Sequence, residues 1–265
     1  MHRNPGLEIV YVSEGSLTWR CENQIENVRS NSLYFTLPGQ MHGSVFDFEP
    51  HHRWYFTVLR LNDSGDFWLP RELGFTHEQA AQLFETFSTS EAHCFECDSL
   101  TGSILPSLVA ELETPSEFFN RRVTALTSEL LLGLYRLIQS RPAIADHSAG
   151  HRARIDKLLL ELEKRLDEPW SLDSLADFVD LKRTRFTEIF KEKTGDTPLR
   201  YLNRLRLRKA RKLLRETDEE ITTIAYSCGY ASSQRFALAF RKMTGVSASV
   251  YRRFGLPEVQ LPRRK

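Results

Sequence analysis

The sequence predicts an α+β protein of two domains, an N-terminal β-barrel with a helical segment and a C-terminal domain made only of helices. Three observations carry this prediction. Strand-like segments lie within residues 7–61, helical periodicity dominates from about residue 76, and the charge changes sign between the two halves of the chain. The composition, with 41% hydrophobic and 27% charged residues, is typical of a folded globular protein.

The charge separates the halves sharply. Residues 1–150 hold 10 basic and 19 acidic side chains, whereas residues 151–265 hold 26 basic and 16 acidic ones. A basic domain suits a polyanion, and an acidic domain is repelled by one. We therefore expect domains over residues 1–140 and 151–265 with different partners. Residues 141–150, RPAIADHSAG, lack periodicity and are expected to be the linker.

No apolar run approaches the roughly 20 residues that cross a bilayer, and the N-terminus lacks the features of a signal peptide. The sequence therefore predicts a cytoplasmic protein without a membrane partner. Strand-like sequence begins almost at the first residue, which leaves a further upstream segment open. Cys94 and Cys97 form a lone CxxC with only His93 nearby, so a structural role is favoured over metal binding.

The N-terminal half contains four segments rich in β-branched and aromatic residues, namely LEIVYV, SLTWRC, SLYFTLP and RWYFTVLRL. Residues 115–139 follow with apolar side chains three and four apart, which predicts a long amphipathic helix. Its stripe consists of Phe118, Phe119, Val123, Leu126, Leu130, Leu134 and Leu137. Two interpretations stay open: the stripe packs on the barrel, or it also pairs with a second copy of the chain.

The C-terminal half repeats itself. Phe186, Phe190, Thr194, Gly195 and Tyr201 recur 50 residues later as Phe236, Phe240, Thr244, Gly245 and Tyr251. Each copy predicts a short helix, a turn, and a second helix with two inward Phe residues, which is the helix-turn-helix pattern. The helices are expected over residues 172–179 and 183–193, and again over residues 221–228 and 233–243.

Local signals support these boundaries. Ser171 and Ser232 are expected to cap the first helix of one unit and the second helix of the other. Gly229 supplies a positive φ in the second turn, and Asp180 takes that place in the first. A helix over residues 198–215 joins the units and carries eight basic side chains. Such a run is either a solvated face or, beside two helix-turn-helix units, a phosphate-contacting surface.

Residues 155–253 resemble the DNA-binding domain of the AraC/XylS family of transcription regulators. The motifs IAYSCGY, QRFALAFRK and TGVSASVYRR carry the resemblance, although Asp180 stands where Gly is common. It implies two helix-turn-helix units on double-stranded DNA, with RNA polymerase as a further partner of an activator. Use of the helical hairpins for protein contact alone is the alternative.

The helical wheel indicates which side chains face outward for DNA. Glu188 suits cytosine, Gln234 adenine, Arg235 guanine and Leu238 the thymine methyl group, whereas Lys191, Arg241 and Lys242 suit phosphates. The full set of expected DNA-binding residues is Arg183, Thr184, Thr187, Glu188, Lys191, Ser233, Gln234, Arg235, Leu238, Arg241 and Lys242.

The segment SLYFTLPGQMH resembles the cupin-like sensor barrel that precedes such a DNA-binding domain in sugar-responsive regulators. Metal-dependent cupins carry a His-x-His-(three or four)-Glu motif, and here Ser44 replaces the second His between His42 and Glu49. Unless His51 or His52 substitutes, the metal site is incomplete, so a metal-free pocket without a cofactor is favoured. The expected effector-binding residues are Glu8, Trp19, His42, Ser44, His52 and Trp54.

The sequence thus predicts a dimeric, DNA-binding transcription regulator that is not an enzyme and that responds to a small-molecule effector, expected to be a sugar. Two alternatives remain. One is a metal-dependent cupin enzyme fused to a DNA-binding module, and the other is a ligand-independent architectural DNA-binding protein. The effector, the operator and the choice between activation and repression do not follow from the sequence.

Overall fold

The chain forms two compact units, residues 1–147 and residues 148–265, each described here by itself. A computed structural model describes residues 1–46, 52–60, 73–140 and 149–254. Most of the linker expected over residues 141–150 lies outside the described residues.

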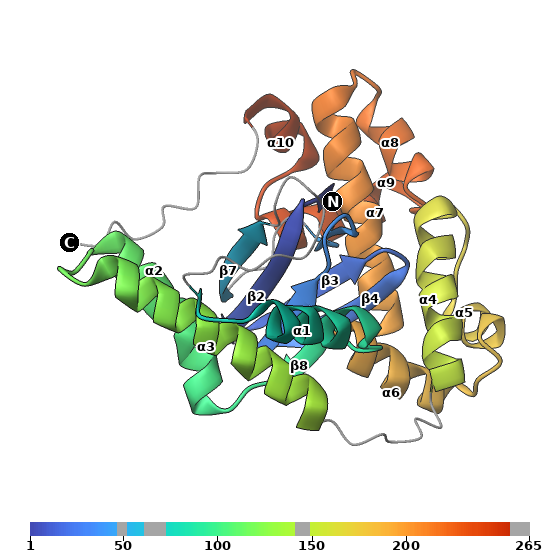
Figure 1. Ribbon diagram of the computed structural model, residues 1–265. Helices are drawn as coiled ribbons and strands as arrows, with labels where there is room; N and C mark the ends of the chain where they lie inside the picture. Colours follow the sequence, from blue (N-terminus) through green and yellow to red (C-terminus); the bar gives the residue numbers. More distant parts are fainter. Residues whose placement is uncertain (47–51, 61–72, 141–148, 255–265) are drawn as a thin grey trace. The chain divides into compact units, whose positions relative to one another are not determined.

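The N-terminal unit is built on two four-stranded antiparallel sheets (Figure 1). The first sheet has the order β1-β6-β3-β4, formed by His2–Arg3, Met41–Ser44, Ser16–Cys21 and Gln24–Arg29. The second has the order β7-β2-β5-β8, formed by Arg53–Arg60, Gly6–Glu14, Ser32–Thr36 and Cys94–Glu96. The four expected strand segments form β2, β3, β5 and β7, and β1, β4, β6 and β8 complete the sheets.

Alternation along the strands divides the apolar residues of this unit into two cores. Val10, Trp19 and Tyr34 belong to the cluster between the sheets. Leu7, Ile9 and Phe35 face outward and pack against the helices α1 (His77–Thr89), α2 (Ser99–Glu113) and α3 (Phe119–Ser140). One face of the β7-β2-β5-β8 sheet is therefore covered by the helices, and the other face, called the inner face, lines the barrel interior.

The predicted helix over residues 115–139 corresponds to α3, but it begins four residues later than expected. Phe118 precedes the helix and is 66% exposed, so its place in the stripe was wrong. Leu130 and Leu134 are fully buried, and Val123, Leu126 and Leu137 pack against the same cluster. The stripe of α3 is thus covered by the sheet and by its neighbouring helices.

Cys94 and Cys97 also have a structural setting. Cys94 lies in β8, which pairs with β5, and the buried Cys97 packs in the outer cluster. Burial raises the pKa of the Cys97 thiol to about 12, so it stays protonated at neutral pH. Both cysteines are free thiols.

The C-terminal unit is all helical. Its helices are α4 (Ala149–Lys164), α5 (Leu172–Phe178), α6 (Arg183–Thr194), α7 (Pro198–Glu216), α8 (Ile221–Ser227), α9 (Ser233–Thr244) and α10 (Ala248–Phe254). The long helix α7 contacts α5 and α6 as well as α8 and α9, so it joins two small helical bundles (Figure 1). The predicted helix boundaries agree with these to within one residue.

Candidate nucleic-acid interface and effector pocket

Two helix-turn-helix units flank α7, and local capping sets their boundaries. The Ser171 side chain accepts a hydrogen bond from the Ser174 backbone and caps α5, and the Ser232 side chain accepts one from the Arg235 backbone and caps α9. The turns contain Asp180 at φ 54° and Gly229 at φ 81°. Both predicted caps and both predicted positive-φ positions are confirmed.

The second helix of each unit buries its Phe pair and exposes a polar face. Phe186 and Phe190 in α6, and Phe236 and Phe240 in α9, are fully buried. Of the expected DNA-binding residues, Thr187 and Ser233 are half-buried and the others are exposed, namely Arg183, Thr184, Glu188, Lys191, Gln234, Arg235, Leu238, Arg241 and Lys242. Leu238 is 74% exposed, so among the described residues no packing accounts for a large apolar side chain there.

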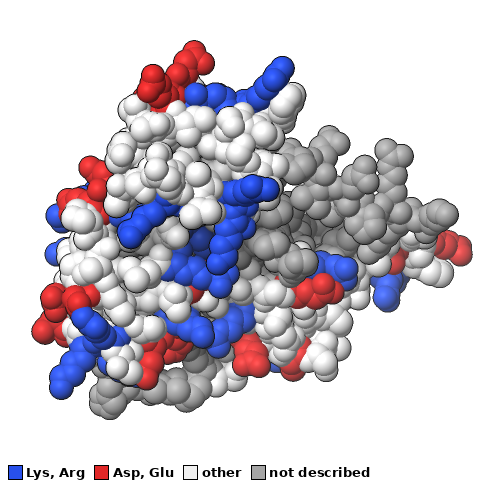
Figure 2. Space-filling view, turned by 180° about the vertical axis from the view of Figure 1, so that it is seen from behind, with Lys and Arg blue, Asp and Glu red and all other residues white. Residues whose placement is uncertain are grey.

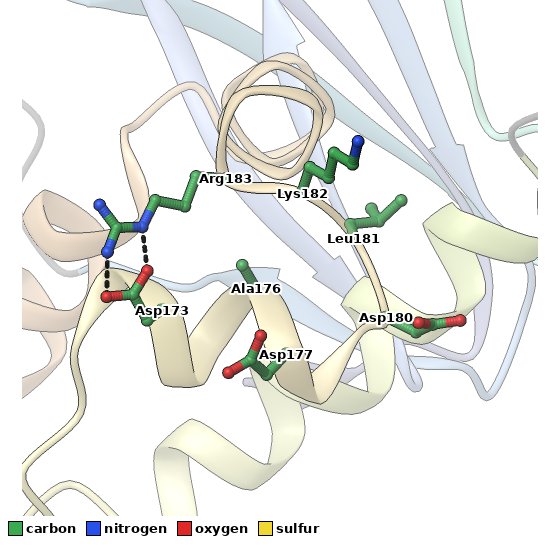
Figure 3. Close-up of a pocket in the computed structure, with 7 residues that line it drawn as sticks. All are labelled: Asp173, Ala176, Asp177, Asp180, Leu181, Lys182 and Arg183. Carbon is green, nitrogen blue, oxygen red and sulfur yellow. Dashed lines mark hydrogen bonds and ion pairs between the residues drawn. The ribbon is translucent and has the colours of Figure 1, made fainter.

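Ion pairs within the chain hold the polar face of α6. Arg183 binds the Asp173 carboxylate through two guanidinium nitrogens, as Figure 3 shows. Arg185, which the sequence analysis did not select, lies 3.3 Å from the Glu188 carboxylate. Its i,i+3 spacing from Glu188 was the signal that could have found it. One carboxylate oxygen of Glu188 therefore already has a cationic neighbour, while the side chain stays exposed.

The turn of the first unit forms a surface hollow lined by Asp173, Asp177, Asp180, Lys182 and Arg183, together with Ala176 and Leu181 (Figure 3). Its three carboxylates outnumber its two cations. With this excess of negative charge, the hollow repels phosphate.

The polar face of α9 has different surroundings. Residues 221–244 contain no acidic side chain and three basic ones, Arg235, Arg241 and Lys242. None of the three forms an ion pair with the residues that the structure describes. Figure 2 shows the charges of one whole face of the molecule, on which Lys and Arg side chains form an interrupted band with Asp and Glu side chains beside it.

Seven of the eight basic side chains of α7 bind groups of this unit, which differs from both expectations for this helix. Arg204 lies 2.5 Å from Asp196, and Arg208 lies 2.8 Å from Glu163. Arg206 donates hydrogen bonds to the carbonyl oxygens of Leu166 and Glu168. Four others also bind groups of this unit: Arg200, Lys209, Arg211 and Lys212. These cations therefore already have partners within the unit and do not form an unpaired phosphate-binding strip.

The barrel interior brings several expected effector residues together. Glu8 and His42 are 3% and 0% exposed, and His42 Nε2 lies 3.1 Å from Glu8 Oε2. The indole of Trp19 stacks on the His42 ring at 6.3 Å and meets the Trp54 ring edge-on at the same separation. Burial disfavours protonation of His42, but hydrogen bonds to Glu8 and Gln40 outweigh burial and raise its pKa.

The other two candidates are less well placed. Ser44 Oγ bonds to the backbone of Phe46, so it closes a local turn. His52 precedes β7, and its buried Nδ1 has no hydrogen-bond partner among the described residues. The residues Glu49 and His51, considered as ligands in a cupin-type metal motif, lie outside the described part of the chain.

The structure adds residues that the sequence analysis did not select. Thr36 pairs with Glu8 in register, and its buried hydroxyl has no partner among the described residues. Phe56 lies two residues from Trp54 and is 56% exposed although it shares the inner face of the sheet. His2 pairs with His42 in register and approaches Glu8. These contacts depend on strand register and had no local signal.

Comparisons with known proteins agree with both units. A family model described as "AraC-like ligand binding domain" matches residues 1–163, and one described as "Helix-turn-helix domain" matches residues 175–253. No described helix is long and apolar enough to cross a membrane.

Curated relatives include the HTH-type transcriptional activators RhaS of Citrobacter koseri and of an Enterobacter species. They are 38% and 39% identical over 135 and 136 residues, which cover 51% of this chain and 48% of each relative. The chain thus spans about half the length of the curated relatives it matches. The solved AraC-type regulator of Chromobacterium violaceum is 30% identical, with 40% of this chain and 94% of that chain covered at a TM-score of 0.36.

The ligand-binding family model alone covers more than half of the sequence. The chain therefore belongs to the AraC family.

Proposed function

We propose that this chain is an effector-responsive transcription regulator that binds double-stranded DNA through α6 and α9. The observation that carries the proposal is the pair of exposed polar helix faces, each set on a buried Phe pair and joined by α7. The family models and the printed names of the relatives support a regulator rather than a cupin enzyme. A regulator of this kind acts in the cytoplasm and, as an activator, contacts RNA polymerase.

The test is the salt dependence of DNA binding by the full chain. Each phosphate neutralised by Lys or Arg changes the slope of log K against log salt by about −0.9. We expect a clearly negative slope on random duplex DNA and a smaller one for Arg241→Gln combined with Lys242→Gln. The matched control is Arg121→Gln combined with Arg136→Gln, in α3 of the other unit. Absence of binding at low salt, or equal slopes for both pairs, would contradict the assignment.

We further propose that the barrel binds a polar cyclic effector such as a sugar. Trp54 and Phe56 are 37% and 56% exposed although they belong to the inner face of the β7-β2-β5-β8 sheet, and they can stack on an apolar ring face. The buried Trp19 Nε1, Thr36 Oγ1 and His52 Nδ1 have no described partner. Leaving such groups unpaired costs about 1–3 kcal/mol each, so hydroxyl groups of a ligand would find partners here.

A thermal-shift screen against a panel of sugars tests the effector proposal. A ligand present at 100 times its dissociation constant stabilises the protein by about 2.7 kcal/mol. The shift should disappear in Trp54→Ala and persist in Tyr226→Ser, which changes an exposed aromatic residue in α8 of the other unit. A shift that survives Trp54→Ala would place the ligand elsewhere.

A dimer remains part of the proposal, but its surface cannot be the stripe of α3. Leu130 is fully buried, so Leu130→Glu would unfold the unit and would not report on association. Leu112 and Phe118 near the α2–α3 connection are 61% and 66% exposed and are better candidates. Sedimentation of Phe118→Glu should show a smaller particle than the parent chain, and an unchanged particle would exclude this surface.

A further inference from the structure

Three potential metal ligands meet at one end of the barrel interior. His2 in β1 and His42 in β6 are register partners, and Glu8 comes from β2 in the other sheet. Glu8 Oε2 lies 3.1 Å from His42 Nε2 and 3.6 Å from His2 Nε2. The three ligand atoms all lie within 4.8 Å of one another.

The hydrogen bonds of His42 decide what it presents to Glu8. His42 Nδ1 lies 2.8 Å from the Gln40 carbonyl oxygen, which can only accept, so Nδ1 carries a hydrogen. In the neutral ring Nε2 then presents a lone pair to a carboxylate oxygen. Two buried acceptors at 3.1 Å require a cation between them, either a proton or a metal ion. A backbone carbonyl on the far nitrogen is the arrangement typical of metal-binding histidines.

The separations suit a common ion. Nitrogen and oxygen ligands at about 2.0–2.2 Å from zinc are about 2.8–3.6 Å apart at octahedral to tetrahedral angles. The two contacts of Glu8 fall in or next to this range. Two imidazoles and one carboxylate are a donor set for zinc and for other divalent transition metals. Asn4 donates a hydrogen bond to the same Glu8 oxygen and fixes the carboxylate from outside.

A second observation points to a bound group at the same place. Thr36 lies opposite Glu8 in the β2–β5 register, on the same face of the sheet, and is 1% exposed. Its hydroxyl has no hydrogen-bond partner among the residues that the structure describes. Water or an anion at an open coordination position would supply one. His2 is exposed, so an ion can enter from solvent.

We propose that His2, Glu8 and His42 bind one divalent transition-metal ion, for which zinc is the probe. The ligand missing at Ser44 is thus replaced by residues from other strands, and the expectation of a metal-free pocket is revised. The site does not depend on the proposed DNA or effector binding, because its test uses neither.

The experiment titrates zinc into the full chain after treatment with a chelator, with any affinity tag at the C-terminus and free of histidine. We expect one zinc per chain, and weakening by about a hundredfold or more in Glu8→Gln and in His42→Gln, since even outer-shell changes cost 10–100-fold. His77→Gln, an exposed histidine of α1, is the matched control and should bind as the parent does. Cobalt should give the visible absorption of a low-coordinate site, lost in the same variants.

Glu8 and His42 are buried, so substitutions there can unfold the N-terminal unit and abolish zinc binding indirectly. The variant His2→Gln avoids this ambiguity. His2 is exposed on a two-residue strand, so this variant should fold, bind zinc at least tenfold more weakly and lose most of the zinc-induced thermal shift. Two results would overturn the site. One is no stoichiometric binding of micromolar zinc by the parent chain, which would leave a shared proton between Glu8 and His42. The other is binding by His2→Gln and His42→Gln equal to that of His77→Gln.

Discussion

The two helix-turn-helix units share a backbone plan but not a charge pattern. Residues 172–194 hold five acidic and five basic side chains, whereas residues 221–244 hold three basic side chains and no acidic one. In the first unit, Arg183 binds Asp173 and Arg185 lies beside Glu188. In the second unit, Arg235 forms no ion pair with any described residue. The two units therefore share a core of buried Phe residues but differ in the charges of their surfaces.

From this difference we predict that the second unit attracts DNA more strongly than the first. The three cations of the second unit are ready for phosphates and bases, so it should supply most of the electrostatic attraction. To contact DNA, Arg183 and Arg185 of the first unit would have to leave their carboxylate partners, which reduces the free energy gained on binding. Exposed ion pairs contribute only about 0–1 kcal/mol to stability, so breaking them costs little free energy. The exchange of partners does not by itself favour DNA binding.

The largest expected effect comes from the turns. In the second turn, a Cβ on Gly229 would lie 2.2 Å from the Leu166 carbonyl oxygen, and the residue has φ +81°. Gly229→Ala should therefore cost about 3 kcal/mol or more of unfolding free energy, measured by urea denaturation. Gly245→Ala is the control, because it has φ +79° but open space around its Cβ, and it should cost about 1 kcal/mol. Equal costs would mean that the clash with the Leu166 carbonyl oxygen is relieved and that only the positive φ is penalised.

The next effect separates base reading from phosphate contact within α9. Arg235 is exposed near the start of the helix and Lys242 near its end. Arg235→Ala should weaken binding to a selected DNA site by about 1–3 kcal/mol while random DNA is affected much less. Lys242→Ala should weaken both alike and reduce the salt slope by about one. Equal losses on both DNAs for Arg235→Ala would assign its side chain to phosphate.

The smallest expected effect concerns the ion pair between Arg183 and Asp173 in the first unit. Asp173→Asn removes the partner of Arg183 and should tighten DNA binding by about threefold to tenfold at low salt, measured by fluorescence anisotropy. Asp177→Asn, in the same hollow, removes the same charge but leaves the Arg183–Asp173 pair intact. If both variants tighten binding equally, only net charge matters and the ion pair does not restrain Arg183.

Sequence patterns predict local features of these units well. Capping serines, positive-φ turn positions and Phe residues four apart determine helix ends to within one residue, since each is a short-range effect. The same reasoning placed the start of α3 at Pro115, but the helix begins at Phe119.

Long-range contacts were beyond such reasoning. Arg208 and Glu163 are 45 residues apart in the sequence, and only the folded C-terminal unit brings them together. Likewise, β8 has three residues and exists because it pairs with β5, and His2 joins Glu8 and His42 through the β1–β6 register. The sequence could predict that the helix over residues 198–215 is basic, but the partners of its cations, like those of His2, depend on the topology of the fold.

The central claim is that the two helix-turn-helix units contribute unequally to DNA binding. The most direct test selects bound sequences from a random duplex library with the full chain, and with Arg235→Ala and Asp173→Asn in parallel. The account predicts a site with two blocks about one helical turn apart, because each unit presents one recognition helix. One block should be sharper and should flatten in Arg235→Ala, while the other should change only in Asp173→Asn. A pool without enrichment, or a single block insensitive to Arg235→Ala, would contradict the account.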